Sequence, residues 1–159
     1  MSPDRTRRGL AGLGGPSGRN GLLAPMASFD VGTTVADTAV CELCKPVNVL
    51  LANELSFVRL DSNSLSRGHV LVIPRRHVAS FFDMTTAEQS AVLGLLTEAQ
   101  RLIQRDYSPD GYNIGVNVGK AGGQSRMHVH VHLIPRYAGD VADPSGGIRC
   151  VLAQRAHGA

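Results

Sequence analysis

Three histidines alternate with apolar residues in the stretch MHVHVHLIPRY, residues 127–137 of the 159-residue chain. They are His128, His130 and His132, half of the six histidines that the chain contains. Side chains in a strand alternate between faces, so the three imidazoles are expected on one face. The side chains expected to pack into the core on the other face are Met127, Val129, Val131 and Leu133. A solvent-exposed strand face would show the same alternation, but Ser, Thr or Lys would serve equally there. The presence of three histidines therefore favours a chemical role.

Strand geometry argues against a single metal ion held by all three histidines. Alternate residues lie about 6.6 Å apart along a strand, so His128 and His132 are separated by roughly 13 Å. A tetrahedral zinc ion needs each ligand nitrogen at about 2.1 Å. Two neighbouring imidazoles could share an ion, but the outer two are too far apart. The three histidines are therefore expected to have different tasks.

A second set of candidate metal ligands lies earlier in the chain. Cys41 and Cys44 have the C-x-x-C spacing of a zinc half-site, and His77 follows the segment VIPRR. If one end of the histidine row joined them, the ligand set would be two cysteines and two histidines. A redox dithiol would need a βαβ context, which the pattern does not predict. Two free structural cysteines are the remaining alternative.

A glycine-rich loop, NVGKAGGQS at residues 117–125, precedes the histidine row. Its glycines allow backbone N–H groups to approach a ligand closely and to form an anion-binding nest. Gln124 and Ser125 add hydrogen-bonding side chains, whereas Lys120 does not have the neighbours of a P-loop lysine. Anion-binding groups beside imidazoles indicate phosphate chemistry, in which a neutral imidazole can attack phosphorus and form a covalent intermediate.

The surrounding elements predict an α+β domain on a mostly antiparallel sheet. Strands are expected at residues 48–54, 57–61, 69–74, 112–119 and 127–137. Thr85 and Glu88 form a capping box at the start of the one clear helix. The turn sequence SPDG, residues 108–111, ends that helix. Its apolar stripe consists of Val92, Leu95, Leu96, Ala99, Leu102 and Ile103.

The composition divides the chain into three parts. Residues 1–35 are rich in Gly, Arg and Pro and are expected to be a disordered extension. A start codon assigned too early, ahead of Met26, would produce such a segment; an Arg-rich transit peptide is the alternative. Residues 36–140 are expected to form the folded domain, and residues 141–159 a C-terminal tail.

The overall charge and the cysteine content exclude several classes of function. The net charge of +3 suits an anionic ligand, but no Lys/Arg block of the kind that binds nucleic acid is present. No apolar run approaches the roughly 18 residues of a membrane span. Three cysteines without a signal peptide argue against a disulfide framework and predict a cytoplasmic protein.

Taken together, these motifs resemble those of the histidine triad (HIT) family. HVHVHLI fits the alternating histidine motif of that family, GGQS directly precedes it, and LDSNSLSRGHVLVIPRRH resembles the upstream segment. CELC, residues 41–44, is similar to the N-terminal pair of the zinc-containing branch. The resemblance covers residues 41–137 and implies a five-stranded antiparallel sheet with one long and one shorter helix, in a homodimer.

The resemblance also implies cleavage of nucleotides at the α-phosphate. His130 would be the nucleophile, supported by His132 and His69. The residues implied to bind the nucleotide, expected to be a purine nucleotide, are Asp61, Asn117, Gln124 and Ser125. The implied ligands of a structural Zn²⁺ are Cys41, Cys44, His77 and His128.

Substrates would be dinucleoside polyphosphates, nucleoside phosphoramidates or related adenylates, and the leaving group stays open. Transfer to phosphate instead of water stays open as well. One departure concerns Arg59, which stands where many family members carry an aromatic residue in the base pocket. Arg149 in the tail is a further candidate for contacting a polyphosphate. The alternative functions are a nucleotide-binding regulatory protein with little activity and a cupin-like metal oxidase.

Overall fold

The computed structural model describes residues 41–151. The expected N-terminal extension, residues 36–40 of the expected domain, and the end of the tail at 152–159 lie outside the described residues.

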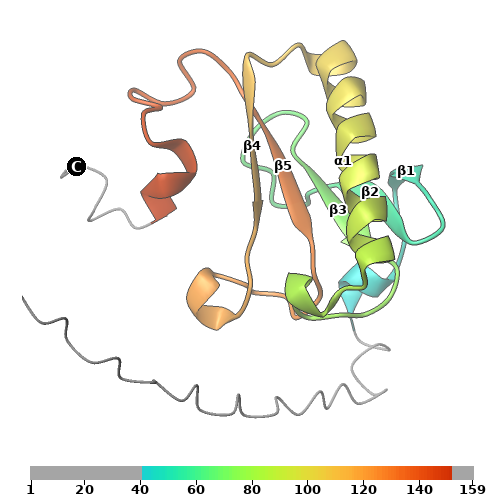
Figure 1. Cartoon of the computed structure of the whole chain (residues 1–159). Coiled ribbons are helices and arrows are strands. Elements are labelled where there is room, and N and C mark those ends of the chain that lie inside the picture. Colours follow the sequence, from blue (N-terminus) through green and yellow to red (C-terminus); the bar gives the residue numbers. More distant parts are fainter. Residues whose placement is uncertain (1–40, 152–159) are drawn as a thin grey trace, which may run out of the picture. The chain divides into compact units, whose positions relative to one another are not determined.

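A five-stranded antiparallel sheet with the strand order β1-β2-β3-β5-β4 forms the centre of the domain (Figure 1). The strands are β1 (Val49–Ala52), β2 (Ser56–Leu60), β3 (Val70–Pro74), β4 (Gly111–Val116) and β5 (Val131–Arg136). Every neighbouring pair is antiparallel. The predicted α+β architecture is therefore confirmed, with β3 as the predicted central strand.

One long helix, α1 (Thr86–Tyr107), covers one face of the sheet. The predicted capping box is present, because the Thr85 hydroxyl accepts from the N–H of Glu88 while the Glu88 carboxylate accepts from the N–H of Thr85. The helix ends at Ser108, which adopts a left-handed conformation. The other helical segments within residues 41–151 are short 3-10 turns, so the expected shorter helix is represented there only by such turns.

The apolar stripe of α1 packs against the sheet in the main core. Val92, Leu95, Ala99 and Ile103 are at most 1% exposed and contact valines of β2 and β3. Val129, Val131 and Leu133 join this core, as the alternation around the histidines predicted.

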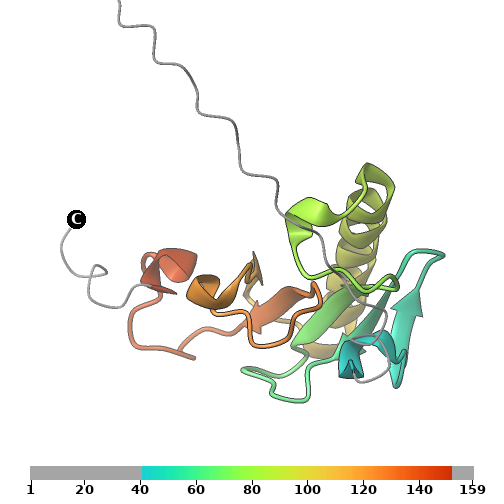
Figure 2. The same ribbon diagram turned by 90° about the horizontal axis from the view of Figure 1, so that it is seen from below.

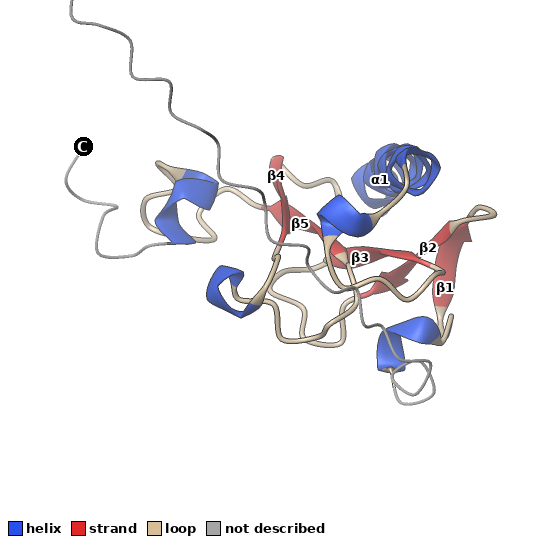
Figure 3. Ribbon diagram, turned by 60° about the horizontal axis from the view of Figure 1, so that its bottom comes forward, coloured by secondary structure: helices blue, strands red, loops and turns tan. Residues whose placement is uncertain are grey.

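A smaller apolar cluster lies on the opposite face of the sheet. Leu43, in the 3-10 turn η2 (Glu42–Cys44), packs there with Phe57, Leu71 and Ile73. Figure 3 shows η2 and α1 on opposite sides of the sheet. The two cysteines on either side of Leu43 are thereby held close to the end of β3.

The last strand is shorter than predicted and begins only at Val131. His128 and His130 precede it, because β3 ends at Pro74 and its ladder with β5 ends at the Val72–Val131 pair. The N–H of Val129 instead donates to the carbonyl of Val78 at 2.8 Å. The packing predicted for Met127 is wrong as well, since its side chain is 49% exposed.

The single long helix is too polar to cross a membrane, and no other helix within residues 41–151 is long enough to do so.

Candidate active site and metal site

One ring nitrogen of His130 is hydrogen-bonded, and the other has no hydrogen-bond partner within residues 41–151. Its Nδ1 lies 2.8 Å from the carbonyl oxygen of His128, so Nδ1 carries the proton and donates. The proton-free Nε2 of the neutral ring then keeps its lone pair. The side chain is buried, at 7% exposure. A buried imidazole with this tautomer is set up to act as a nucleophile.

His132 and His69 form the neighbouring pair. The N–H of Leu65 donates to Nδ1 of His69 at 3.2 Å, so the proton of His69 is on Nε2. That proton is donated to Nδ1 of His132, at 3.1 Å, which leaves His132 with its own proton on Nε2. The rings of His130 and His132 have centroids 5.0 Å apart. The proton-free Nε2 of His130, an acceptor, and the protonated Nε2 of His132, a donor, thus belong to neighbouring rings.

Asp61 lies beside this pair at the end of β2. One carboxylate oxygen is 3.6 Å from Nε2 of His69 and 3.8 Å from Nδ1 of His132. The other oxygen accepts from the N–H of Asn63 at 2.9 Å, which fixes the carboxylate in the turn after the strand. The three residues therefore form one compact cluster.

Burial keeps His69 and His132 neutral. Desolvation lowers the pKa of His132 to about 4, with the nearby His130 and His69 adding to the effect and Asp61 opposing it. The pKa of His69 is lowered by burial and raised in part by Asp61. At neutral pH both rings are therefore uncharged, and their hydrogen-bond directions are fixed by the tautomers above.

The glycine-rich loop differs from the anion-binding nest that was expected. The N–H groups of Gly122 and Gln124 donate to the carbonyl of Gly119, and that of Gly123 donates to the carbonyl of Lys120. The N–H of Gly119 donates to the side chain of Gln124. These four donors are used inside the loop, because the chain closes a 3-10 turn, η4, at Lys120–Gly122.

The side chain of Gln124 therefore has a structural role in this loop. Its carbonyl oxygen accepts from Gly119 at 2.8 Å, and its amide nitrogen donates to the carbonyl of Ala79 at 2.7 Å. Ser125 and Asn117 are exposed, and neither side chain makes a hydrogen bond within residues 41–151. Of the polar side chains expected here, Ser125 and Asn117 are thus the ones available to a ligand.

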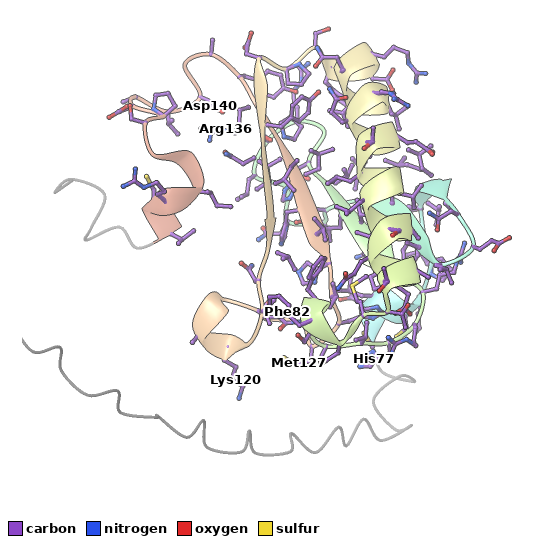
Figure 4. All side chains as sticks on the ribbon, in the orientation of Figure 1. His77, Phe82, Lys120, Met127, Arg136 and Asp140 are labelled. Carbon is purple, nitrogen blue, oxygen red and sulfur yellow. The ribbon has the colours of Figure 1, made fainter. Side chains whose placement is uncertain are left out.

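The four predicted zinc ligands come together at the end of β3. Nδ1 of His128 lies 3.5 Å from the sulfurs of both Cys41 and Cys44, and Nδ1 of His77 lies 3.3 Å from the sulfur of Cys44. All four ligand atoms lie within 4.8 Å of one another. Figure 4 shows His77 at the same end of the sheet as Lys120 and Met127.

These separations fit a tetrahedral ion. Two ligands at about 2.1 and 2.3 Å from a zinc ion are roughly 3.6 Å apart at the tetrahedral angle. The tautomer of His128 also fits, because its Nε2 donates to the carbonyl of Pro74 at 2.9 Å and leaves Nδ1 toward the sulfurs. Burial and the adjacent Cys41 raise the pKa of Cys44 to about 11, so a cation is needed to favour the thiolate.

The groups that fix these rings include backbone atoms that the sequence could not point to. They are the carbonyls of Pro74 and His128 and the N–H of Leu65; the carbonyl of Ala79 holds Gln124 in the same way. A backbone group carries no residue-type signal, and only the folded arrangement brings it to a side chain.

The tail contributes another contact that the sequence did not predict. Residues Gly147–Val151 form the 3-10 turn η5, which lies against β4. A Cβ at Gly115 would lie 3.5 Å from Cδ1 of Ile148, and Gly115 is paired with His132 across the sheet. In Figure 2 η5 and α1 are well separated, with β4 and β5 between them. Arg149 is exposed within this turn.

Comparison with known proteins supplies the family context. The family model described as the HIT domain matches residues 43–139. An AP-4-A phosphorylase of Mycobacterium tuberculosis is 34% identical over 93 residues, which is 58% of this chain and 48% of that protein. An asymmetrical bis(5'-nucleosyl)-tetraphosphatase of Schizosaccharomyces pombe is 35% identical over 95 residues, covering 60% of this chain and 52% of that one. The chain thus spans about half the length of these two curated relatives.

A solved structure of similar fold is that of a zinc-bound histidine triad family protein from Mycobacterium smegmatis. It aligns with a TM-score of 0.61 and 28% identity, over 67% of this chain and 81% of that one.

Proposed function

The chain belongs to the HIT domain family, and on this basis we propose that it is a nucleotide hydrolase or transferase that cleaves at the α-phosphate. The observation that carries the proposal is the tautomer of His130, whose Nδ1 donates to a backbone carbonyl and whose Nε2 keeps its lone pair. The names of the phosphorylase and tetraphosphatase relatives support dinucleoside polyphosphates as one substrate class. Nucleoside phosphoramidates and related adenylates are the other classes.

The first half-reaction joins the nucleotide to His130. Nε2 attacks the α-phosphorus, a P–N bond forms, and the leaving group departs with the electron pair of the bond that breaks. The ring becomes cationic, and its Nδ1–H remains bonded to the carbonyl of His128, which stabilises the charge. Nε2–H of His132 is placed to donate to a phosphate oxygen or to the leaving atom.

The second half-reaction releases the nucleotide. Water, or inorganic phosphate in the transferase case, attacks the same phosphorus, and the electron pair of the P–N bond returns to Nε2, so the ring regains its neutral tautomer. The proton lost by the attacking group is released to solvent. Asp61 is proposed to accept from ribose hydroxyls, since its carboxylate borders the His69–His132 pair. Ser125 and Asn117 are proposed to contact the phosphate from the exposed side of the loop.

We also propose that Cys41, Cys44, His77 and His128 hold a structural zinc ion. When bound, the ion would tie η2 to the end of β3 and fix the backbone of His128, which in turn holds His130. The homodimer and the cytoplasmic location that the sequence implied stay predictions. Size-exclusion chromatography with light scattering tests the first of these.

A substrate panel tests the function. The full chain is assayed with a dinucleoside tetraphosphate, an adenosine phosphoramidate and adenosine phosphosulfate, each with and without inorganic phosphate. At least one compound is expected to be turned over by the wild type and by Met127→Ala, whose side chain is exposed, and not by His130→Ala. Nucleoside diphosphate formed only with phosphate identifies the transferase. Turnover retained in His130→Ala would refute the covalent mechanism.

A further inference from the structure

Arg59 contains the one buried side-chain nitrogen or oxygen within residues 41–151 that has no hydrogen-bond partner. The atom is Nε, and the residue as a whole is 9% exposed. A buried donor without an acceptor is unfavourable, so such groups are rare and call for a specific explanation. Arg76, Arg105, Arg126 and Arg136 each pair with a carboxylate, whereas no ion pair involves Arg59 in the part of the chain that the structure describes.

The sheet register places Arg59 on the same face as the candidate active site. Arg59 is paired with Leu71 of β3, and Leu71 is paired with His132 of β5. Directly paired residues of an antiparallel sheet share a face. Neighbouring strands are about 4.8 Å apart, so the backbones of Arg59 and His132 are separated by roughly 10 Å.

Asp61 is close both to Arg59 in the chain and to the histidines of the candidate active site. It follows Arg59 by two residues, and its carboxylate lies 3.8 Å from Nδ1 of His132. For a nucleotide with its phosphorus at His130 and its ribose at Asp61, we place the base over the sheet face that Leu71 and Arg59 share. The surroundings suit a flat base, because Leu71 belongs to an apolar cluster with Leu43, Phe57 and Ile73.

We infer that Arg59 is a specificity-determining residue that selects a guanine base; this rests on the proposed function. Because Nε is fully buried, a ligand would meet the two terminal N–H groups of the guanidinium, which also form a two-donor edge. Guanine offers two adjacent acceptors, O6 and N7, which match this edge. Binding guanine would give acceptors to the terminal N–H groups of Arg59, which have no hydrogen-bond or ion-pair partner within residues 41–151, and would so offset part of the cost of burying this unpaired cation.

Adenine fits the same edge poorly. It presents N7 as an acceptor but an amino group as a donor at the neighbouring position, so one N–H of Arg59 would face another N–H. A site built around buried hydrogen-bond donors rejects a ligand that leaves them unpaired. Stacking of the base on the guanidinium would not distinguish the two purines and would therefore predict equal binding of GMP and AMP.

Calorimetry with GMP and AMP tests the inference without requiring catalysis. The wild-type chain is expected to bind GMP about 10- to 100-fold more tightly than AMP. Arg59→Lys keeps the charge but not the two-donor edge, and Arg59→Leu keeps only the apolar stem. Both variants should lose the preference, mainly through weaker binding of GMP. Arg101→Leu, an exposed position on α1, is the matched control and should keep it.

Kinetics with guanosine and adenosine phosphoramidates, which share one leaving group, provide the second arm. The guanosine compound should have the lower KM in the wild type, and Arg59→Lys should raise that KM with little change in kcat. Equal binding of the two nucleotides by the wild type, or the same loss for both in Arg59→Lys, would overturn the inference. Base preference with no turnover would instead refute only the proposed function.

Discussion

Nδ1 of His130 lies 2.8 Å from the carbonyl oxygen of His128, whose own Nδ1 lies 3.5 Å from the sulfurs of Cys41 and Cys44. The same residue therefore faces the candidate metal site with its side chain and the candidate nucleophile with its backbone. Loss of the metal should consequently displace the group that fixes the tautomer of His130. Stability and catalysis are expected to be coupled through His128.

Replacing one thiol ligand tests this coupling. Cys44→Ser should lower the zinc content, the melting temperature and kcat together, because structural metal binding is linked to folding. Zinc is measured by mass spectrometry of the purified protein and melting by calorimetry. Cys150→Ser is the control, since Cys150 is an exposed free thiol, and it should change none of the three. Full zinc retention in Cys44→Ser would remove Cys44 from the ligand set.

The hydrogen bond from His69 to His132 is expected to fix the tautomer of His132. His69→Phe keeps a ring in the buried space but removes the donor, so kcat should fall about tenfold. His69→Gln retains an N–H donor and should recover part of the loss. Nitrogen NMR shifts of His132 report the tautomer directly. An unchanged His132 spectrum in His69→Phe would contradict this role.

Acid should destabilise the fold through His132. Its folded pKa, about 4, is below the usual value of 6.5, so the unfolded chain binds the proton more readily. The neutral ring therefore contributes stability fully above pH 6.5, and this contribution is lost as the pH falls toward 4. The free energy of unfolding, measured with urea at several pH values, should depend less steeply on pH over this window for His132→Asn than for the wild type. The same pH dependence of the unfolding free energy in both proteins would contradict a buried neutral His132.

The capping box of α1 gives a prediction about stability alone. The Thr85 hydroxyl accepts from the N–H of Glu88 at 3.2 Å, and its removal in Thr85→Ala should cost about 1 kcal/mol in the free energy of unfolding. Thr97→Ala lies on the exposed side of the same helix and should cost less. Urea unfolding compares the two variants. An equal loss in Thr97→Ala would contradict a specific role of the cap, because Ala is the better helix former at an interior position.

Much of the fold could be predicted from local patterns. The capping box and apolar stripe of α1 and the apolar run of β3 are encoded in adjacent residues, and all are present. The exact start of β5 could not be predicted, because it depends on where β3 ends at Pro74 and on the bond from Val129 to Val78.

The candidate site was predictable in its side chains but not in its backbone partners. The C-x-x-C pair and the histidines have distinctive types and spacings, and they meet as expected. The inward-turned N–H groups of the glycine-rich loop carry no such signal, which is why the nest was expected and is not seen. The unpaired Nε of Arg59 also becomes apparent only when its surroundings are known.

Trapping the covalent intermediate tests the proposed mechanism most directly. The wild-type chain is mixed with a turned-over nucleotide, quenched within milliseconds in alkali, digested and analysed by mass spectrometry. A nucleotidyl group is expected on the imidazole of His130 and should be absent in His130→Ala. Rapid turnover with no adduct at any time, or an adduct on His132 or His69 instead, would contradict the proposed mechanism.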